Sequence, residues 1–288
     1  MNTPIVLLAL NKKEYYQMAF NAAASIKHFN QGVQITLLHD GKHKLPESKS
    51  WIFDKSICMD ADDTTHNGVF HPGKAKLNIY KYLDKGAYLY LDVDVICIAP
   101  FGDIVENCEK AKGYYYVLQS GHLWASESDI RHYNGLSADA VIYGMNSSFM
   151  FMRTGKELNK FFERAMKAMF EGLPASNLSM PWGQSYPDEL AMTVACADLK
   201  VNPYLDFGDP IRFFGRTSNY DQEIGGARMV ALFGPKGMIP LKAIDRCDKV
   251  MRNVCATFSM AHEYKILPLM KGKYANKHRL VEGGINRG

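Results

Sequence analysis

Residues 88–96 read Tyr88-Leu89-Tyr90-Leu91-Asp92-Val93-Asp94-Val95-Ile96, an apolar run that carries two carboxylates two positions apart. Continuous apolar runs of this length are typical of a buried strand in a parallel sheet. An unpaired carboxylate inside such a strand would be strongly destabilising. We therefore expect the strand to end before Asp92. The two acids should then lie at its carboxyl end, where open α/β sheets bind ligands.

The spacing of Asp92 and Asp94 also has a chemical meaning. Side chains at positions i and i+2 of an extended segment point to the same side. Two carboxylates placed in this way can hold a hard divalent cation, and the cation can in turn hold a diphosphate. An Asp-x-Asp pair alone is also consistent with two acids that merely cap a loop, so the metal interpretation needs support from the rest of the chain.

The amino-terminal region predicts a β-α-β unit, which is the signature of a parallel sheet. Strands are expected at residues 4–10 and 34–38, with a helix at 12–29 between them and Asn11 as its N-cap. We predict an α/β fold with a mostly parallel, Rossmann-like sheet flanked by helices, in one domain over residues 1–262 with a less regular carboxyl-terminal part. Further strands are expected at 56–59, 87–91, 113–119 and 147–153, helices at 74–83, 154–171, 187–197 and partly 240–254, and a long loop or lid at 120–135.

The composition limits the class of protein. The chain has 288 residues with 47% hydrophobic and 22% charged content, enough for a sizeable core. No run approaches the roughly 18 apolar residues of a membrane span, and the amino terminus lacks the basic and apolar regions of a signal peptide. Six cysteines without a Cys-x-x-Cys pair indicate reduced thiols. We expect a soluble, cytoplasmic protein.

Residues 263–288 form a basic tail. Six basic and two acidic residues give this segment a charge equal to the net +4 of the whole chain. Such a tail is usually a solvated terminus, and less often it binds phosphate, nucleic acid or an anionic surface.

Several motifs occur in a characteristic order along the chain. Lys74-Ala75-Lys76-Leu77 precedes Tyr-Leu-Asp-Val-Asp, Asn146-Ser147-Ser148 precedes a predicted strand, Pro187-Asp188-Glu189-Leu190 opens a predicted helix, and His262 is followed by Lys265. Over residues 4–265 this order resembles glycosyltransferase family eight, the glycogenin and bacterial galactosyltransferase-like enzymes. It is also similar to the wider superfamily of GT-A nucleotide-sugar transferases, so the resemblance implies the GT-A fold.

The resemblance implies a metal site. Asp92 and Asp94 match the metal-binding Asp-x-Asp of the family, and the first of the two also contacts the ribose of the donor. His262 matches a late histidine ligand, and His278 is a rival for that role. Manganese suits a mixed set of carboxylates and imidazole, while magnesium, which prefers oxygen ligands alone, is the alternative.

The resemblance also implies residues that bind the donor. Lys76, with Lys74 as an alternate, matches a lysine that reaches the donor, and Lys265 would add positive charge at the phosphates. Asn146 matches an asparagine that touches the donor sugar. Ser148 stands where the family has glycine. We also assign Asn11, at the end of the first strand, as a donor-binding candidate.

The remaining catalytic assignment concerns two adjacent acids. Asp188 matches an aspartate near the reacting carbon, and Glu189 replaces the glutamine that follows it in the family. Acids at these positions also stabilise an ordinary helix start through the helix dipole.

The implied activity is metal-dependent transfer of a sugar from a UDP-sugar to an acceptor hydroxyl, with retention of configuration. An inverting enzyme would instead use Asp188 or Glu189 as a general base. The expected acceptor is a glycan, or less often a modified DNA base reached through the basic tail. Two alternatives are a sugar-nucleotide nucleotidyltransferase, which residues 10–14 disfavour because they contain no glycine, and a degenerate nucleotide-sugar-binding module, which Ser148 and Glu189 keep open.

Overall fold

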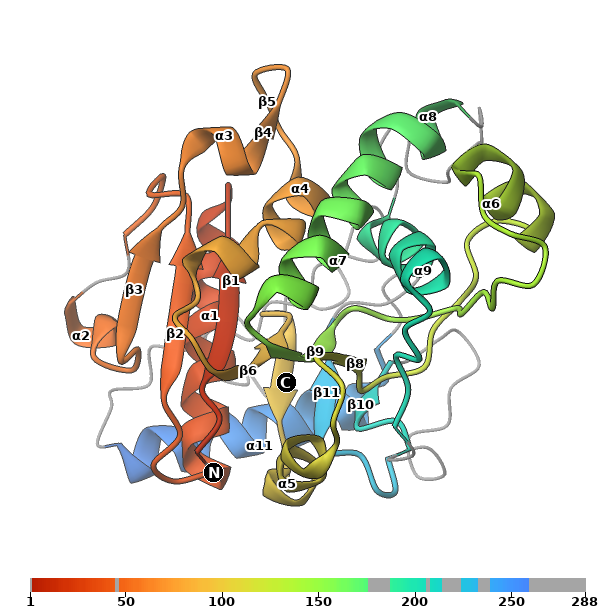
Figure 1. Cartoon of the computed structure of the whole chain (residues 1–288). Coiled ribbons are helices and arrows are strands. Elements are labelled where there is room, and N and C mark those ends of the chain that lie inside the picture. Colours follow the sequence, from red (N-terminus) through yellow and green to blue (C-terminus); the bar gives the residue numbers. More distant parts are fainter. Residues whose placement is uncertain are drawn as a thin grey trace.

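The computed structural model describes residues 2–44, 47–175, 187–205, 208–213, 224–232 and 239–258. A six-stranded sheet in the order β3-β2-β1-β6-β9-β8 forms its centre (Figure 1). The first four of these strands run parallel, β9 is antiparallel to β6, and β8 is antiparallel to β9. The strands are β1 (Ile5–Ala9), β2 (Ile35–His39), β3 (Lys55–Cys58), β6 (Ala87–Leu91), β8 (Tyr115–Val117) and β9 (Phe149–Arg153). The predicted mostly parallel α/β sheet is therefore confirmed.

Helices cover both faces of this sheet. They include α1 (Lys13–Phe29), α3 (Ala61–Thr64), α4 (Pro72–Leu77), α5 (Gly102–Lys110), α6 (Glu127–Asn134), α7 (Lys156–Lys167), α9 (Asp188–Leu199) and α11 (Leu241–Thr257). The shorter elements are α2 (Glu47–Ser50), α8 (Leu173–Ala175), a 3-10 helix (Ile79–Tyr82), a π-helical turn (Ala168–Gly172) and the hairpin strands β4 (Thr65–His66) and β5 (Val69–Phe70). Helices α1 and α11 pack together on one side, and α4, α7 and α9 pack together on the other.

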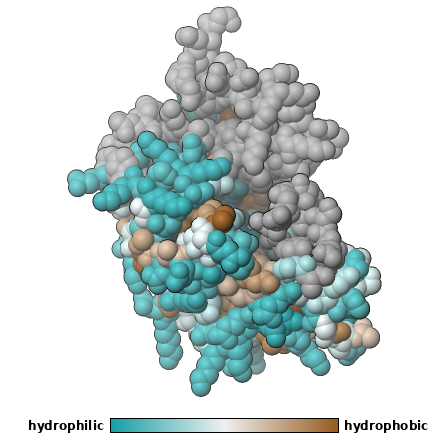
Figure 2. All heavy atoms as spheres, turned by 90° about the horizontal axis from the view of Figure 1, so that it is seen from above, coloured by the Kyte–Doolittle hydropathy of each residue, from teal (hydrophilic) through white to brown (hydrophobic). Residues whose placement is uncertain are grey.

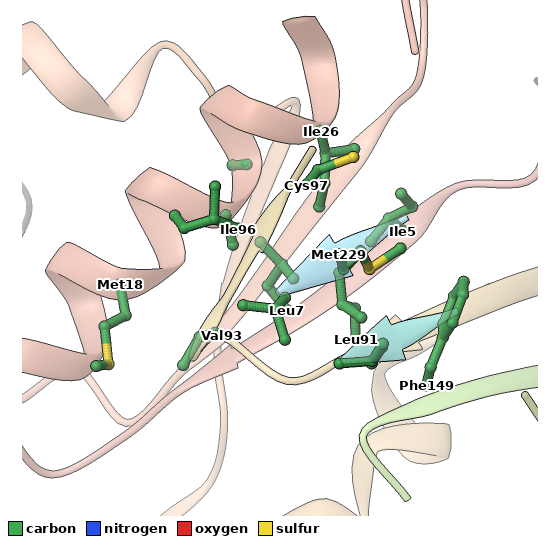
Figure 3. Close-up of a cluster of buried hydrophobic side chains, with 14 of the residues drawn as sticks. Ile5, Leu7, Met18, Ile26, Leu91, Val93, Ile96, Cys97, Phe149 and Met229 are labelled. Carbon is green, nitrogen blue, oxygen red and sulfur yellow. The ribbon is translucent and has the colours of Figure 1, made fainter. Parts of the chain in front are cut away.

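Each central strand is buried on both faces, which explains the continuous apolar runs. In β1, Ile5 and Leu7 pack with α1 and α11, whereas Val6 lies in the second core with α4, α7 and α9. Figure 3 shows the first of these cores, where Leu7 and Val93 lie near Met18 of α1.

A smaller sheet joins the large one at the end of β6. Strand β7 (Val95–Cys97) pairs antiparallel with β11 (Met229–Ala231), which pairs parallel with β10 (Ile211–Arg212). The chain therefore leaves the large sheet at Leu91 and enters the small one at Val95. Asp92 and Asp94 occupy the turn between the two sheets.

Two local predictions were wrong. Asn11 is not the N-cap of α1, because the helix begins at Lys13, Lys12 is the cap residue, and no side chain caps it. Asn11 instead has a left-handed backbone, with a φ of 66°, and its N–H donates to Asp40 Oδ2 at 2.7 Å. The expected loop at residues 120–135 contains helix α6, which Ser126 caps by accepting a hydrogen bond from the Asp129 N–H.

Other features bear on the wider predictions. No helix in the described part of the chain has the length and apolar character of a membrane span. All six cysteines are free thiols; five are buried and Cys58 is exposed. The basic tail, residues 263–288, lies outside the described residues. On the face shown in Figure 2, the described surface is mostly hydrophilic, with hydrophobic residues gathered in a band across its middle.

Candidate functional site

Asp92 and Asp94 lie in the acid-pair turn, residues 92–94, which follows β6. Backbone hydrogen bonds hold this turn on both sides. Strand β6 ends at Leu91, as predicted, because Asp92 begins the turn. The Asp92 N–H donates to the Ser148 carbonyl at 2.9 Å, and the Leu232 N–H donates to the Asp94 carbonyl at 2.7 Å. The main chain of the turn is therefore tied to the β9 side of the large sheet at one end and to the end of β11 at the other.

Lys76, in the last turn of α4, joins three distant segments. It is only 9% exposed. Its Nζ lies 2.9 Å from Ser147 Oγ, 3.0 Å from Asp92 Oδ1 and 3.3 Å from Asp188 Oδ2. An ammonium group has three N–H donors, so these three acceptors can satisfy it completely. The segment before β9, the turn after β6 and the start of α9 thus meet at one buried cation.

Asp92 presents its two oxygens to different partners. Oδ1 accepts a hydrogen bond from the Tyr90 hydroxyl at 2.6 Å in addition to its contact with Lys76. The Tyr90 ring also lies under the ammonium, with Lys76 Nζ 5.1 Å from the ring centroid. Within the described residues, no hydrogen bond or ion pair engages Asp92 Oδ2. That oxygen is available to a ligand, while Oδ1 fixes the carboxylate.

Asp94 lies in an environment that disfavours its negative charge. Burial, followed by repulsion from Asp92, raises the pKa of Asp94 to about 7, although Lys76 opposes the shift. The same two carboxylates also act on Tyr15 of α1. Burial, followed by the charges of Asp94 and Asp92, raises the pKa of Tyr15. A bound cation would relieve this repulsion, so the donor set suits a divalent metal.

A complete metal site cannot be assembled from the described residues. No group of three histidine, cysteine, aspartate or glutamate side chains among them could hold a metal ion. The predicted third ligand, His262, its rival His278 and the phosphate-binding candidate Lys265 all lie outside the described residues.

Asp188 and Glu189 begin α9, with Pro187 as its N-cap residue, close to the predicted helix start. The Ser147 hydroxyl donates to Asp188 Oδ2 at 2.6 Å and lies 3.3 Å from Glu189 Oε1. Burial and then the charge of Asp188 raise the pKa of Glu189 to about 7, against the opposing effect of Lys76.

Replacing Glu189 with glutamine should flatten the pH dependence of stability. The folded state binds the Glu189 proton more tightly than the unfolded state, so the stability this provides is full below about pH 4.5 and is lost as pH rises through about 7. Glutamine cannot ionise. As pH rises from 4.5 to 8, the unfolding free energy of Glu189→Gln should therefore increase by about 1–3 kcal/mol relative to that of the wild type.

Urea unfolding of both proteins in EDTA across this range measures the difference. Asp94 titrates in the same window in both proteins and cancels in the comparison. Parallel stability curves would contradict the prediction.

The other predicted residues have different positions. Asn146 Oδ1 accepts a hydrogen bond from the Ser148 N–H at 2.8 Å and so shapes the turn that places Ser147. Lys74 Nζ donates to the Thr65 carbonyl at 2.8 Å. Its ammonium is therefore engaged outside the cluster, which consists of Lys76, Tyr90, Asp92, Ser147, Asp188 and Glu189.

Asn11 also bonds outside this cluster. Its side-chain oxygen accepts from Lys42 Nζ at 3.2 Å, its N–H donates to Asp40, and its carbonyl lies 3.0 Å from His43 Nε2. These contacts tie the turn after β1 to the segment that follows β2, and the donor-binding role of Asn11 stays a prediction.

Sequence reasoning missed two residues of the cluster, Tyr90 and Ser147. Tyr90 belongs to the pattern of an apolar strand, but its hydroxyl needs a partner when buried. Ser147 lies within Asn-Ser-Ser, where the resemblance assigns a role to the asparagine. A polar atom inside a buried motif is the signal that could have identified both.

Comparison with solved structures identifies the fold. No protein-family description and no curated protein matches the sequence. The structure is similar to the galactosyltransferase LgtC in complex with donor and acceptor sugar analogs, with a TM-score of 0.55, 13% identity, and coverage of 91% of this chain and 98% of that one.

Two further structures agree with this result. An active-site mutant of LgtC gives a TM-score of 0.53 at 13% identity, covering 88% of this chain and 96% of that one. The apo form of the glycosyltransferase GlyE of Streptococcus pneumoniae TIGR4 gives 0.52 at 13% identity, covering 89% of this chain and 64% of that one. The chain therefore has the GT-A fold implied by its motifs.

Proposed function

We propose that this chain is a metal-dependent glycosyltransferase that moves a sugar from a UDP-sugar to an acceptor hydroxyl. The observation that carries the proposal is the position of Asp92 and Asp94 at the end of β6, beside the buried Lys76, in a chain with the GT-A fold. LgtC, which has a similar fold, was solved with donor and acceptor sugar analogs, which supports a two-substrate transfer here.

Asp92 and Asp94 would hold the metal, with His262 as the proposed third ligand. When bound, a divalent ion supplies Lewis acidity that neutralises the departing diphosphate. We favour manganese over magnesium because the proposed set mixes carboxylate and imidazole. Asp92 Oδ2, which no described residue engages, and the raised pKa of Asp94 fit a site completed by a cation.

Asp188 would stabilise positive charge on the sugar, and this supports a retaining reaction. Its Oδ2 accepts a hydrogen bond from the Ser147 hydroxyl at 2.6 Å and lies 3.3 Å from Lys76 Nζ. Two donors on this oxygen hold the carboxylate in one orientation, so that it can present a fixed negative charge to the site. Glu189 lacks such close donors among the described residues, so a base-assisted, inverting reaction would use Glu189.

The acceptor that we propose is a glycan hydroxyl. A nucleic-acid acceptor would depend on the charge of residues 263–288, and its binding would weaken steeply with added salt. We further propose that residues 1–262 form the catalytic domain with this tail as an appendage, and that the protein acts in the cytoplasm, where its six free thiols would stay reduced.

Isothermal titration of UDP with and without Mn²⁺ tests the donor site. We expect binding that requires the metal, followed by hydrolysis or transfer when UDP-sugars are screened with glycan acceptors. Binding of GDP or CDP in place of UDP would change only the nucleotide base of the proposed donor. The absence of binding by all three nucleotides, in both metal conditions, would overturn the proposed function.

A further inference from the structure

Ser147 lies at the centre of the cluster and has no assigned role in the proposed reaction. It is fully buried. Its Oγ accepts an N–H of Lys76 at 2.9 Å and faces Asp188 Oδ2 at 2.6 Å and Glu189 Oε1 at 3.3 Å. One hydroxyl therefore contacts the cation and both of the adjacent acids.

The hydroxyl cannot serve both acids equally. A serine hydroxyl has one proton to donate, whereas it can accept through two lone pairs. At 2.6 Å the contact with Asp188 is a short hydrogen bond to a carboxylate, while 3.3 Å to Glu189 is a weak one. The proton is therefore directed to Asp188, and the Lys76 N–H occupies a lone pair.

The main chain holds Ser147 in this position. The preceding residue, Asn146, accepts the N–H of Ser148 at 2.8 Å, and the carbonyl of Ser148 accepts the N–H of Asp92 at 2.9 Å. The hydroxyl is thus held in place by bonds on both sides, one of which ties it to the acid-pair turn. A displaced Ser147 would break contacts in both segments.

We propose that Ser147 is a positioning residue that makes the two acids at the start of α9 unequal. It holds Asp188 against Lys76 in the orientation used for the reaction and leaves Glu189 without a strong donor. This inference rests on the proposed glycosyltransferase function. It assigns to Ser147 an effect on turnover that acts through Asp188, without contact with the donor.

Steady-state kinetics of Ser147→Ala test the inference. Loss of a hydrogen bond to a charged group corresponds to about a tenfold to hundredfold fall in kcat. The donor KM and the affinity for UDP with Mn²⁺ should stay within about threefold of wild type, because the metal-binding acids are retained. Ser147→Thr, which keeps the hydroxyl, should recover most of kcat.

A matched control separates this effect from a general loss of packing. Ser25 is equally buried, and its hydroxyl bonds the Ala22 carbonyl and the Cys97 N–H on the far side of the sheet. Ser25→Ala should lower the melting temperature, as the loss of a buried hydroxyl does, and leave kcat unchanged. If Ser147→Ala does not fold, Ser147→Cys provides the same test, because a thiol is a weak donor.

A double-mutant cycle with Glu189→Gln gives a readout that a structural role would not move. If Ser147 acts by favouring Asp188 over Glu189, the fold loss of kcat that Ser147→Ala causes should be at least threefold smaller in the Glu189→Gln background than in the wild-type background. Equal kcat losses in both backgrounds, or wild-type kcat in Ser147→Ala, would overturn the inference. If the proposed glycosyltransferase function itself were wrong, the wild-type protein would neither bind UDP nor transfer a sugar.

Discussion

Asp94→Ala should lower sugar transfer about a hundredfold or more and abolish the dependence of UDP binding on Mn²⁺. Asp94 lies partly buried beside Asp92, and a bound cation would relieve the repulsion between the two carboxylates. With alanine at this position, Asp92 Oδ2 would be the one oxygen of the pair that no described residue engages. Calorimetric titration of UDP and a donor-hydrolysis assay, each with and without Mn²⁺, measure both effects.

Two comparisons make this result specific to the site. Asp62→Ala removes an exposed acid from the short helix α3, and it should leave binding and transfer unchanged. Asp94→Asn keeps the shape of the side chain without its charge, so it should be nearly as defective as alanine. Transfer at the wild-type rate by Asp94→Ala, with Mn²⁺ still required, would show that the metal site lies elsewhere.

Lys76→Met should destabilise the folded protein by about 3–5 kcal/mol, the usual effect of removing one partner from a buried ion pair. The methionine fills a similar volume but leaves Asp92 and Asp188 without their shared cation. The side chain of Lys76 is only 11% exposed, so solvent screens these charges weakly. Unfolding in urea at pH 7 measures the loss.

The pH range of this effect follows from the pKa of Lys76. Burial alone would lower that pKa, but Asp188 and then Asp92 outweigh it and raise the pKa well above its ordinary value. The stability gained from the charged lysine is therefore fully present below the pKa of the unfolded chain and is lost only as pH rises through the higher folded value. The destabilisation should persist across neutral pH.

A surface lysine provides the matched control. Lys55 pairs with Asp84 at 2.9 Å, but both side chains are largely exposed. Lys55→Met should therefore change stability little. Equal losses from the two substitutions would mean that the buried charge of Lys76 contributes no more to stability than the exposed charge of Lys55.

Sequence patterns predicted the elements whose signal is local. The apolar run of β6 and the charges that follow it place Asp92 at a strand end, because burial and charge are incompatible within one strand. The pattern around Asn11 was misleading, because an asparagine before a helix can also adopt the left-handed backbone that turns β1 into α1. Helix α6 was missed because its eight residues have one buried member, Ile130, and therefore no apolar stripe.

The contacts within the candidate site could not be predicted in this way. Lys76, Ser147 and Asp188 come from three segments that only the folded sheet brings together. Periodicity indicates which face of an element is buried, but it does not show which polar atoms of different segments contact each other. The family resemblance supplied the residues Lys76 and Asp188, and the structure supplied the hydroxyl between them.

The junction between the large and the small sheet limits the changes of length and register that the acid-pair turn can accept. Val93, between the two aspartates, is 6% exposed and packs into the core with Leu7 and Ile96 (Figure 3). Because the flanking main chain is bonded to a different sheet on each side, the turn can neither lengthen nor slip by one residue without driving a carboxylate into that core. The one-residue spacing of Asp92 and Asp94 is thus enforced by packing before any ligand arrives, and length variation in this region should be tolerated only outside the turn.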